Sequence, residues 1–181
     1  MKSMRREKIK EDIKEENLKP LYEEVIRRNS ETVYRLAYSL VRTRSDADDI
    51  YQEVFLRYVR KEPVFDSAEH EKAWFLRVTI NCCKNFWKSP WVQRRNDFDS
   101  DVLDKESVCE PEDENRLLIE TVKQLPEKYR IVIHLFYYEE LSVEEIGKIT
   151  KSKAPTVRTR LTRARRMLKS LLKEKGEDFN V

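Results

Sequence analysis

The sequence predicts an all-α protein in which an N-terminal helical bundle and a C-terminal helix-turn-helix domain are joined by an acidic linker. Three observations lead to this fold class. The chain of 181 residues contains only two glycines, whereas sheet proteins need glycine-rich turns. Apolar residues recur at three- and four-residue steps, which is the period of amphipathic helices. Nine acids and one base between residues 96 and 115 separate the two periodic halves.

These observations divide the chain into five parts. The expected parts are a charged extension (1–19), an N-terminal domain (20–95), the linker (96–111), a C-terminal domain (112–175) and a short tail (176–181). The extension has little apolar surface to bury, and the linker lacks apolar periodicity. Each of the two domains is long enough to build a small core of its own.

Three helices are expected in the N-terminal domain. They are predicted over residues 21–41, 45–59 and 67–88. The second helix is expected to begin at Ser45, because Ser45 and Asp48 have the spacing of a capping box. A proline follows each of the last two helices, and proline disfavours helical backbone in the residue before it.

The C-terminal domain carries the signature of a helix-turn-helix. Pro126 opens its first long helix, since proline suits the first helical turn. Ser142 and Glu145 form a capping box that starts a short helix. Residues 151–153 have the length of a turn between crossed helices, and a second long helix is predicted over residues 154–172.

This last helix divides into an apolar stripe and a basic face. The stripe consists of Val157, Leu161, Ala164, Leu168 and Leu171. Residues 148–175 contain eleven bases and one acid, which favours a polyanionic partner. The predicted contacts to double-stranded DNA are Thr156, Arg158, Thr159, Thr162, Arg163 and Arg166, with Arg160 and Arg165 as further phosphate contacts. The alternative is an ordinary amphipathic helix with a solvated cationic face.

The third helix has a second surface suited to nucleic acid. An arc of about 100° contains Trp74, Arg77, Asn81, Lys84, Asn85 and Lys88. An aromatic ring beside cations and amides is the combination that binds single-stranded DNA, because bases stack on the ring while cations neutralise phosphates. Asn81 could also read a base edge. The alternative for Trp74 is a partly buried aromatic of the bundle.

The second helix is acidic at its start. Asp46, Asp48 and Asp49 lie near its N-terminus, where negative charge stabilises the helix dipole. This local effect is sufficient to explain them. A functional interpretation is that Asp49, together with Gln52 and Glu53, meets a basic partner surface.

No residue pattern in the sequence indicates an enzyme or a cofactor site. His70 and His134 are isolated, Cys82 and Cys83 are adjacent, and Cys109 stands alone, so none has the spacing of metal ligands. We therefore predict no catalytic or metal-binding residue and no cofactor, and expect each histidine to be structural or solvated. Unpaired cysteines, and the lack of an apolar signal or membrane-spanning segment, predict a cytoplasmic protein without membrane insertion.

Two segments of the chain resemble the sigma-70 family of bacterial RNA polymerase sigma factors. The second conserved region of that family is similar to DADDIYQEVFLRYV and KAWFLRVTINCCKNFW. The fourth region is similar to LPEKYRIVIHLFYYEELSVEEIGKITKSKAPTVRTRLTRARRML. The order of the two regions and the acidic spacer resemble the extracytoplasmic-function (ECF) group, and the resemblance covers about residues 20–172.

The resemblance implies a protein that directs core RNA polymerase to promoters and assists strand opening. The implied polymerase-binding residues are Asp46, Asp49, Gln52, Glu53 and Phe55. The face of the third helix would capture an unpaired base of the −10 element, and the last helix would read the −35 element as duplex. The linker would thread through the core enzyme, and an anti-sigma factor is a further partner of many members. The alternative is a helix-turn-helix regulator that does not join the polymerase.

The helix-turn-helix departs from the family pattern at four positions. Lys151 and Lys153 stand where a glycine and a capping serine are usual, and Pro155 stands where a small residue is frequent. Gly147 replaces a common alanine, which is expected to cost up to about 1 kcal/mol of helix propensity. These departures bear on the preferred −35 sequence rather than on the fold.

Overall fold

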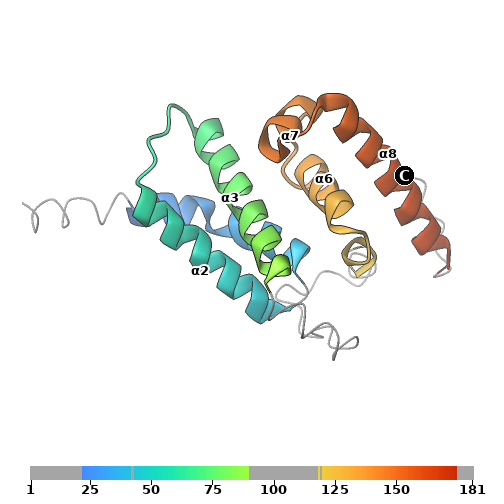
Figure 1. The fold of residues 1–181 in the computed structure, drawn as a ribbon, viewed down its shortest axis with the longest axis horizontal. Coiled ribbons are helices and arrows are strands. Elements are labelled where there is room, and N and C mark those ends of the chain that lie inside the picture. The colour runs from blue at the N-terminus through green and yellow to red at the C-terminus, as the bar shows by residue number, and fades with distance from the viewer. Residues whose placement is uncertain (1–21, 42, 90–117, 119, 175–181) are drawn as a thin grey trace, which may run out of the picture.

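The computed structural model describes residues 22–41, 43–89, 118 and 120–174, and all regular secondary structure in these ranges is helical (Figure 1). The predicted all-α class is therefore confirmed. The helices are residues 22–40, α2 (Arg44–Lys61), α3 (Ala68–Lys88), α6 (Glu127–Tyr137), α7 (Val143–Thr150) and α8 (Ala154–Glu174), and residues 118 and 120–123 are also helical. The expected extension, acidic linker and tail lie outside the described residues.

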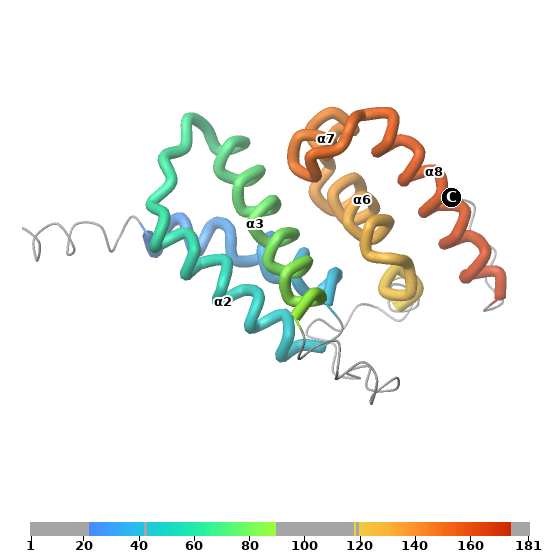
Figure 2. Tube along the Cα trace, viewed as in Figure 1, coloured from blue at the N-terminus to red at the C-terminus, as the bar shows by residue number. Residues whose placement is uncertain are grey.

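The first three helices form the N-terminal bundle. In Figure 2 the helix of residues 22–40, in blue, lies behind α2 and α3. The apolar residues that recur along the three helices, among them Leu36, Val54 and Phe75, are buried in a shared core. A buried carboxylate reinforces this packing, because Glu71 on α3 accepts hydrogen bonds from Arg28 Nη2 at 2.7 Å and from Asn29 Nδ2 at 2.6 Å.

The start of α2 differs from the prediction. The N-cap is Thr43, whose side chain accepts the backbone N–H of Asp46 at 3.1 Å, and Ser45 lies inside the first turn. The prediction of a Ser45 cap was therefore wrong. Serine and threonine hydroxyls both satisfy the free N–H groups at a helix start, so the sequence pattern does not separate two candidates that stand two positions apart.

The C-terminal domain contains the predicted helix-turn-helix. Ser142 and Glu145 form the expected capping box at the start of α7. The apolar stripe holds α8 against α6 and α7. Four of its five predicted residues are buried, but the fifth buried position is Leu172, which is 1% exposed, rather than the half-buried Leu171. The two positions differ by 100° around the helix, and only the packing of α8 selects between them.

The turn between α7 and α8 requires a glycine at position 147. The backbone N–H of Ser152 donates to the Gly147 carbonyl at 2.9 Å. A Cβ atom on Gly147 would lie 2.7 Å from the carbonyl oxygen of Ser152, which is closer than side chains approach backbone. The expectation that Gly147 weakens the helix was incomplete, because this close approach excludes alanine. The neighbouring Lys151 is left-handed, with φ of 53°, a conformation that favours glycine.

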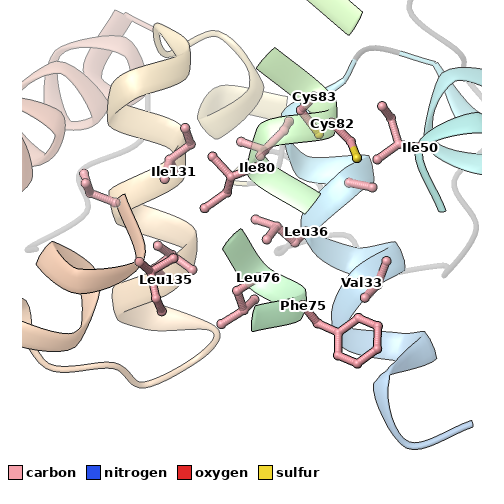
Figure 3. Packing of buried hydrophobic residues seen from close by; sticks show 14 of the residues in the cluster. Val33, Leu36, Ile50, Phe75, Leu76, Ile80, Cys82, Cys83, Ile131 and Leu135 are labelled. Atoms are coloured by element: carbon pink, nitrogen blue, oxygen red, sulfur yellow. The ribbon is translucent and has the colours of Figure 1, made fainter. Parts of the chain in front are cut away.

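The two domains pack directly against each other. Figure 3 shows Leu36, Leu76 and Ile80 of the bundle facing Ile131 and Leu135 of α6, and all five are at most 4% exposed. Helix α3 also contacts α7. The sequence contained no local signal for this arrangement, in which one apolar core continues across both domains.

Candidate nucleic-acid interface

The outer face of α8 presents six of the side chains predicted to contact double-stranded DNA, whereas Arg160 and Arg165 are half-buried and donate to Ser152 Oγ at 3.1 Å and to Tyr137 Oη at 2.8 Å. The exposed residues are Thr156, Arg158, Thr159, Thr162, Arg163 and Arg166. The hydroxyls of Thr159 and Thr162 donate to backbone carbonyls one turn earlier, at 2.9 and 3.0 Å. Their oxygen lone pairs consequently remain available as acceptors. The buried stripe beneath fixes the orientation of this face relative to α7.

One of these arginines is held by the preceding helix. Nη2 of Arg158 lies 2.9 Å from Oε1 of Glu144 on α7, and both side chains are about 60% exposed. Such an exposed pair contributes little to stability. It nevertheless gives the guanidinium a preferred direction at the start of α8, where residues of a recognition helix meet base edges.

A hollow of about 260 Å³ opens between α6 and α8 beside the basic face. It is lined by Lys128, Tyr129, Thr156, Thr159, Arg160 and Arg163. Among the described residues, no carboxylate pairs with its lysine or its two arginines, so an anion would relieve their repulsion. No local sequence pattern indicates Lys128, because it lies on α6 and only folding brings it next to α8.

The face predicted on α3 is partly open. Asn81, Asn85 and Lys88 are exposed, whereas Trp74 and Lys84 are half-buried. The Trp74 ring packs edge-on against Phe65, with centroids 5.8 Å apart, and belongs to the aromatic cluster of the bundle. The interpretation of Trp74 as a bundle aromatic therefore describes its packing, while the ring remains partly exposed on the same helix as the exposed Asn81.

Arg77 lies at one edge of this face, next to α7 of the C-terminal domain. Its Nη2 donates a long hydrogen bond of 3.4 Å to the carbonyl of Lys148 on α7. Its Nε is buried and has no hydrogen-bond partner. Of the six residues predicted on α3, Arg77 is therefore hydrogen-bonded to α7, and its guanidinium remains incompletely satisfied there.

The predicted polymerase-binding residues on α2 do not form one surface. Asp49 and Gln52 are exposed, and Glu53 is half-buried and accepts a hydrogen bond from Arg57 Nε at 2.7 Å. Asp46 and Phe55 are only 4% and 7% exposed. A partner that docks on the folded bundle cannot reach these two side chains. They lie beneath the exposed side of α2 and contribute to its packing.

Two apolar residues that sequence analysis missed lie on the outer side of α2. Leu56 is 48% exposed and Val59 is 43% exposed. At 100° per residue they fall on the same side of the helix as Asp49 and Gln52. Helical spacing from Asp49 could have identified them, but an apolar residue in a helix is normally assigned to the core. The exposed side of α2 thus combines carboxylate, amide and apolar groups.

The remaining reactive side chains are buried or isolated. Burial lowers the pKa of His134 despite the nearby Glu139 carboxylate, whereas His70 is exposed. Burial raises the pKa of the Cys82 thiol to about 11 and that of Cys83 still further. In the described part of the chain, no three potential metal ligands cluster together. Within the same residues, no helix has the length and apolar character needed to cross a bilayer.

Comparisons with known proteins match both domains. The family model of sigma-70 region 2 matches residues 25–92, and that of sigma-70 region 4 matches residues 115–168. The RNA polymerase sigma factor SigV of Bacillus subtilis is 30% identical over 157 residues, which are 86% of this chain and 93% of SigV. The ECF RNA polymerase sigma factor SigE of Mycolicibacterium smegmatis is 33% identical over 165 residues, which are 84% of this chain and 62% of SigE.

Solved structures share the fold. The sigma factor RpoE of Bartonella quintana, solved in complex with the anti-sigma factor NepR, superposes with a TM-score of 0.65 and 23% identity over 84% of this chain and 96% of RpoE. CnrH, solved in complex with the cytosolic domain of CnrY, gives a TM-score of 0.63 and 20% identity over 86% of this chain and 90% of CnrH.

The chain belongs to the ECF group of the sigma-70 family of RNA polymerase sigma factors. Members of this family are transcription initiation factors that direct core RNA polymerase to promoters, and this is the function of the chain. The alternative of a helix-turn-helix regulator that does not join the polymerase is not favoured.

Proposed function

We propose that three faces of the chain divide the work of promoter recognition. The basic face of α8 binds the −35 element as duplex, the polar face of α3 binds the unpaired −10 strand, and the outer side of α2 docks on core polymerase. One observation supports this proposal. The basic face of α8 and the face of α3 that carries Trp74, Asn81 and Asn85 lie on separate domains. The proposed role is that of a non-enzymatic initiation factor, which acts in the cytoplasm, where it meets the polymerase.

For the −35 element, Arg158, Thr159 and Thr162 are proposed to meet base edges. Their position in the first turns of α8 suits a helix that enters the major groove by its N-terminus. Arg163 and Arg166 bind phosphates, and the hollow with Lys128 receives a phosphate of the flanking backbone.

For the −10 element, Asn81 is proposed to read an extruded base. Its amide is exposed and supplies both a donor and an acceptor. The partly exposed Trp74 ring contacts a neighbouring base, and Lys84, Asn85 and Lys88 follow the backbone of the strand.

Docking on core polymerase is proposed for Asp49, Gln52 and Glu53, together with Leu56 and Val59. Asp46 and Phe55 position this surface from the interior. RpoE was solved with the anti-sigma factor NepR bound, and we extend the same kind of partner, an anti-sigma factor, to this chain.

Run-off transcription with purified core polymerase tests the proposed function. The template is a promoter identified by sequencing the DNA that the protein occupies in cells. We expect a transcript that starts at this promoter only when the protein is added. If no complex with core polymerase forms and no promoter-specific transcript appears, the function is refuted.

Asn81→Ala tests the role of α3. In the holoenzyme it should slow promoter opening by about tenfold, since one base contact contributes about 1–3 kcal/mol, while binding to the −35 duplex is unchanged. Opening is followed with a fluorescent base in the −10 element. Gln124→Ala, which removes an exposed amide elsewhere, serves as the control. Equal losses in opening and duplex binding would contradict the single-strand role.

A further inference from the structure

Two exposed lysines flank Ser152 in the turn between α7 and α8 (Figure 1). Lys151 ends α7, and Lys153 directly precedes α8. Among the described residues, no carboxylate pairs with either ammonium. Both acids of α7 are engaged elsewhere, one in the capping box and the other with Arg158. In the described part of the chain, the turn therefore carries two positive charges without a counterion.

Both lysines stand at positions where other residues would stabilise the turn better. Lys151 has φ of 53° and ψ of 44°, and a side chain is strained in this left-handed region, which glycine adopts freely. The Lys153 carbonyl accepts the backbone N–H of Val157 at 3.2 Å, so Lys153 is the capping residue of α8. Serine or aspartate there would accept a free backbone N–H, but an ammonium has no acceptor. The stability of the fold therefore explains neither lysine.

The turn is continuous with the hollow between α6 and α8. Nη1 of Arg160, which lines the hollow, donates to Oγ of Ser152 at 3.1 Å, and Ser152 stands between the two lysines. Lys128 and Arg163 line the same hollow. Residues 148–166 contain eight bases and no acid. Positive charge therefore extends from the turn along α8 to Lys128 on α6.

The phosphates of a DNA strand are the partner that this surface fits. A lysine ammonium offers three donors on a flexible stem and binds phosphate as a point charge. A recognition helix meets base edges with the residues of its first turns. The residues just before it then lie beside the groove, where the sugar–phosphate backbone runs. Contacts of this kind fix the register of the protein on the duplex and carry no sequence information.

We propose that Lys151 and Lys153 bind phosphates of the DNA backbone beside the −35 element and so fix the register of α8 in the groove. The proposal rests on the proposed function, because it takes α8 as the helix that reads this element. The two lysines are positioning residues, and the base-reading side chains lie on α8 itself. Lysine at position 151 thus lowers the stability of the free protein and raises its affinity for DNA.

Lys151→Gly tests the proposal, because its two expected effects have opposite signs. Relief of the left-handed strain should raise the midpoint of urea unfolding of the free protein by about 0.3 M. Promoter binding by holoenzyme should weaken about fivefold at about 0.1 M salt, and the slope of log affinity against log salt should fall by about one. Binding is measured by fluorescence anisotropy with a labelled duplex that covers the −35 element and its flanks, taken from the promoter used for run-off transcription.

Further variants separate the charge from the backbone. Lys151→Gln keeps a strained side chain but removes the charge, so it should weaken binding without raising the midpoint, whereas Lys151→Arg should bind like the wild type. Lys153→Ser should both stabilise the protein and weaken binding. Glu140→Gly is the matched backbone control, because Glu140 is exposed, has φ of 54° and lies in the connection between α6 and α7. It should raise the midpoint without weakening binding.

Wild-type affinity and salt slope of Lys151→Gly holoenzyme would overturn the proposal. A loss confined to one −35 sequence would also overturn it, since the lysine would then contact a base, and so would an equal loss in Lys151→Arg, since the shape of the turn would then matter instead of the charge. A midpoint that does not rise would refute the stability cost of Lys151. Failure of the proposed function would look different, because the wild-type holoenzyme itself would give no promoter-specific transcript.

Discussion

Gly147 illustrates how packing outweighs intrinsic preference at a single residue. Alanine is the better helix former by about 1 kcal/mol, and α7 is a regular helix at this position. The backbone of the following turn, however, passes so close that a Cβ atom would lie 2.7 Å from the Ser152 carbonyl oxygen. Neither group is at the end of a flexible side chain, so relief of the overlap requires the turn itself to move.

Gly147→Ala is therefore expected to destabilise the protein despite its helix propensity. Overpacking of this kind costs about 1–3 kcal/mol, which exceeds the gain in propensity. Urea unfolding followed by circular dichroism measures the change. Ser170→Ala, at an exposed position of α8, should show the propensity gain without a clash. A Gly147→Ala protein that is more stable than wild type would show that the turn adapts freely.

The exposed side of α2 is a property of the whole element. Along the helix, Asp49, Gln52, Leu56 and Val59 share one side, and the last two are apolar yet 48% and 43% exposed. A helix that buries one stripe in its own core normally places polar residues opposite. In an interface with a partner, these two apolar side chains would lie in the buried centre, which is more apolar than the polar rim.

Leu56→Asp should weaken binding to core polymerase by about tenfold or more, because it places an unpaired carboxylate in an interface where water is excluded. Affinity is measured with labelled protein and purified core enzyme. Val64→Asp, at a position that is 85% exposed between α2 and α3, is the matched control and should bind normally. Wild-type affinity of Leu56→Asp would exclude this side of α2 from the docking surface.

At the scale of the whole molecule, titratable groups are buried close to where the domains meet. His134 is 2% exposed, and burial lowers its pKa below the ordinary value of 6.5. Burial raises the pKa of Glu139, but His134 and Lys72 lower it by more, so the carboxyl remains ionised. Both groups bind protons more readily in the unfolded chain than in the folded one, and stability therefore falls as pH falls.

The free energy of unfolding should accordingly decrease below pH 6.5, first through His134 and then, near pH 4.5, through Glu139. Urea unfolding over a pH series measures this profile. His134→Gln should flatten the part that begins at pH 6.5, whereas the exposed His70→Gln should leave it unchanged. A profile that is flat between pH 6.5 and 5 in the wild type would contradict a neutral, buried His134.

The local features of the chain were predictable because neighbouring residues determine them. The Ser142–Glu145 capping box, the start of α3 after Ser67 and most of the α8 stripe follow from the helical period and from hydrogen bonds within one turn. The Thr43 cap and the burial of Leu172 were missed by one or two positions, since local patterns leave adjacent candidates equivalent. The roles of the predicted DNA-contact residues stay predictions, although their exposure on α8 is consistent with them.

The sequence by itself determined that this chain is helical, that it has two domains, and which helix faces are polar, because helix formation and amphipathicity depend on residues within a few turns. Only the tertiary structure decided that Lys128 joins the basic face, that Gly147 has no room for a side chain, and that Arg77 and Lys72 meet the other domain. Each of these features depends on contact between residues that belong to different parts of the chain. Their proximity arises from packing of the apolar core, which no local pattern encodes.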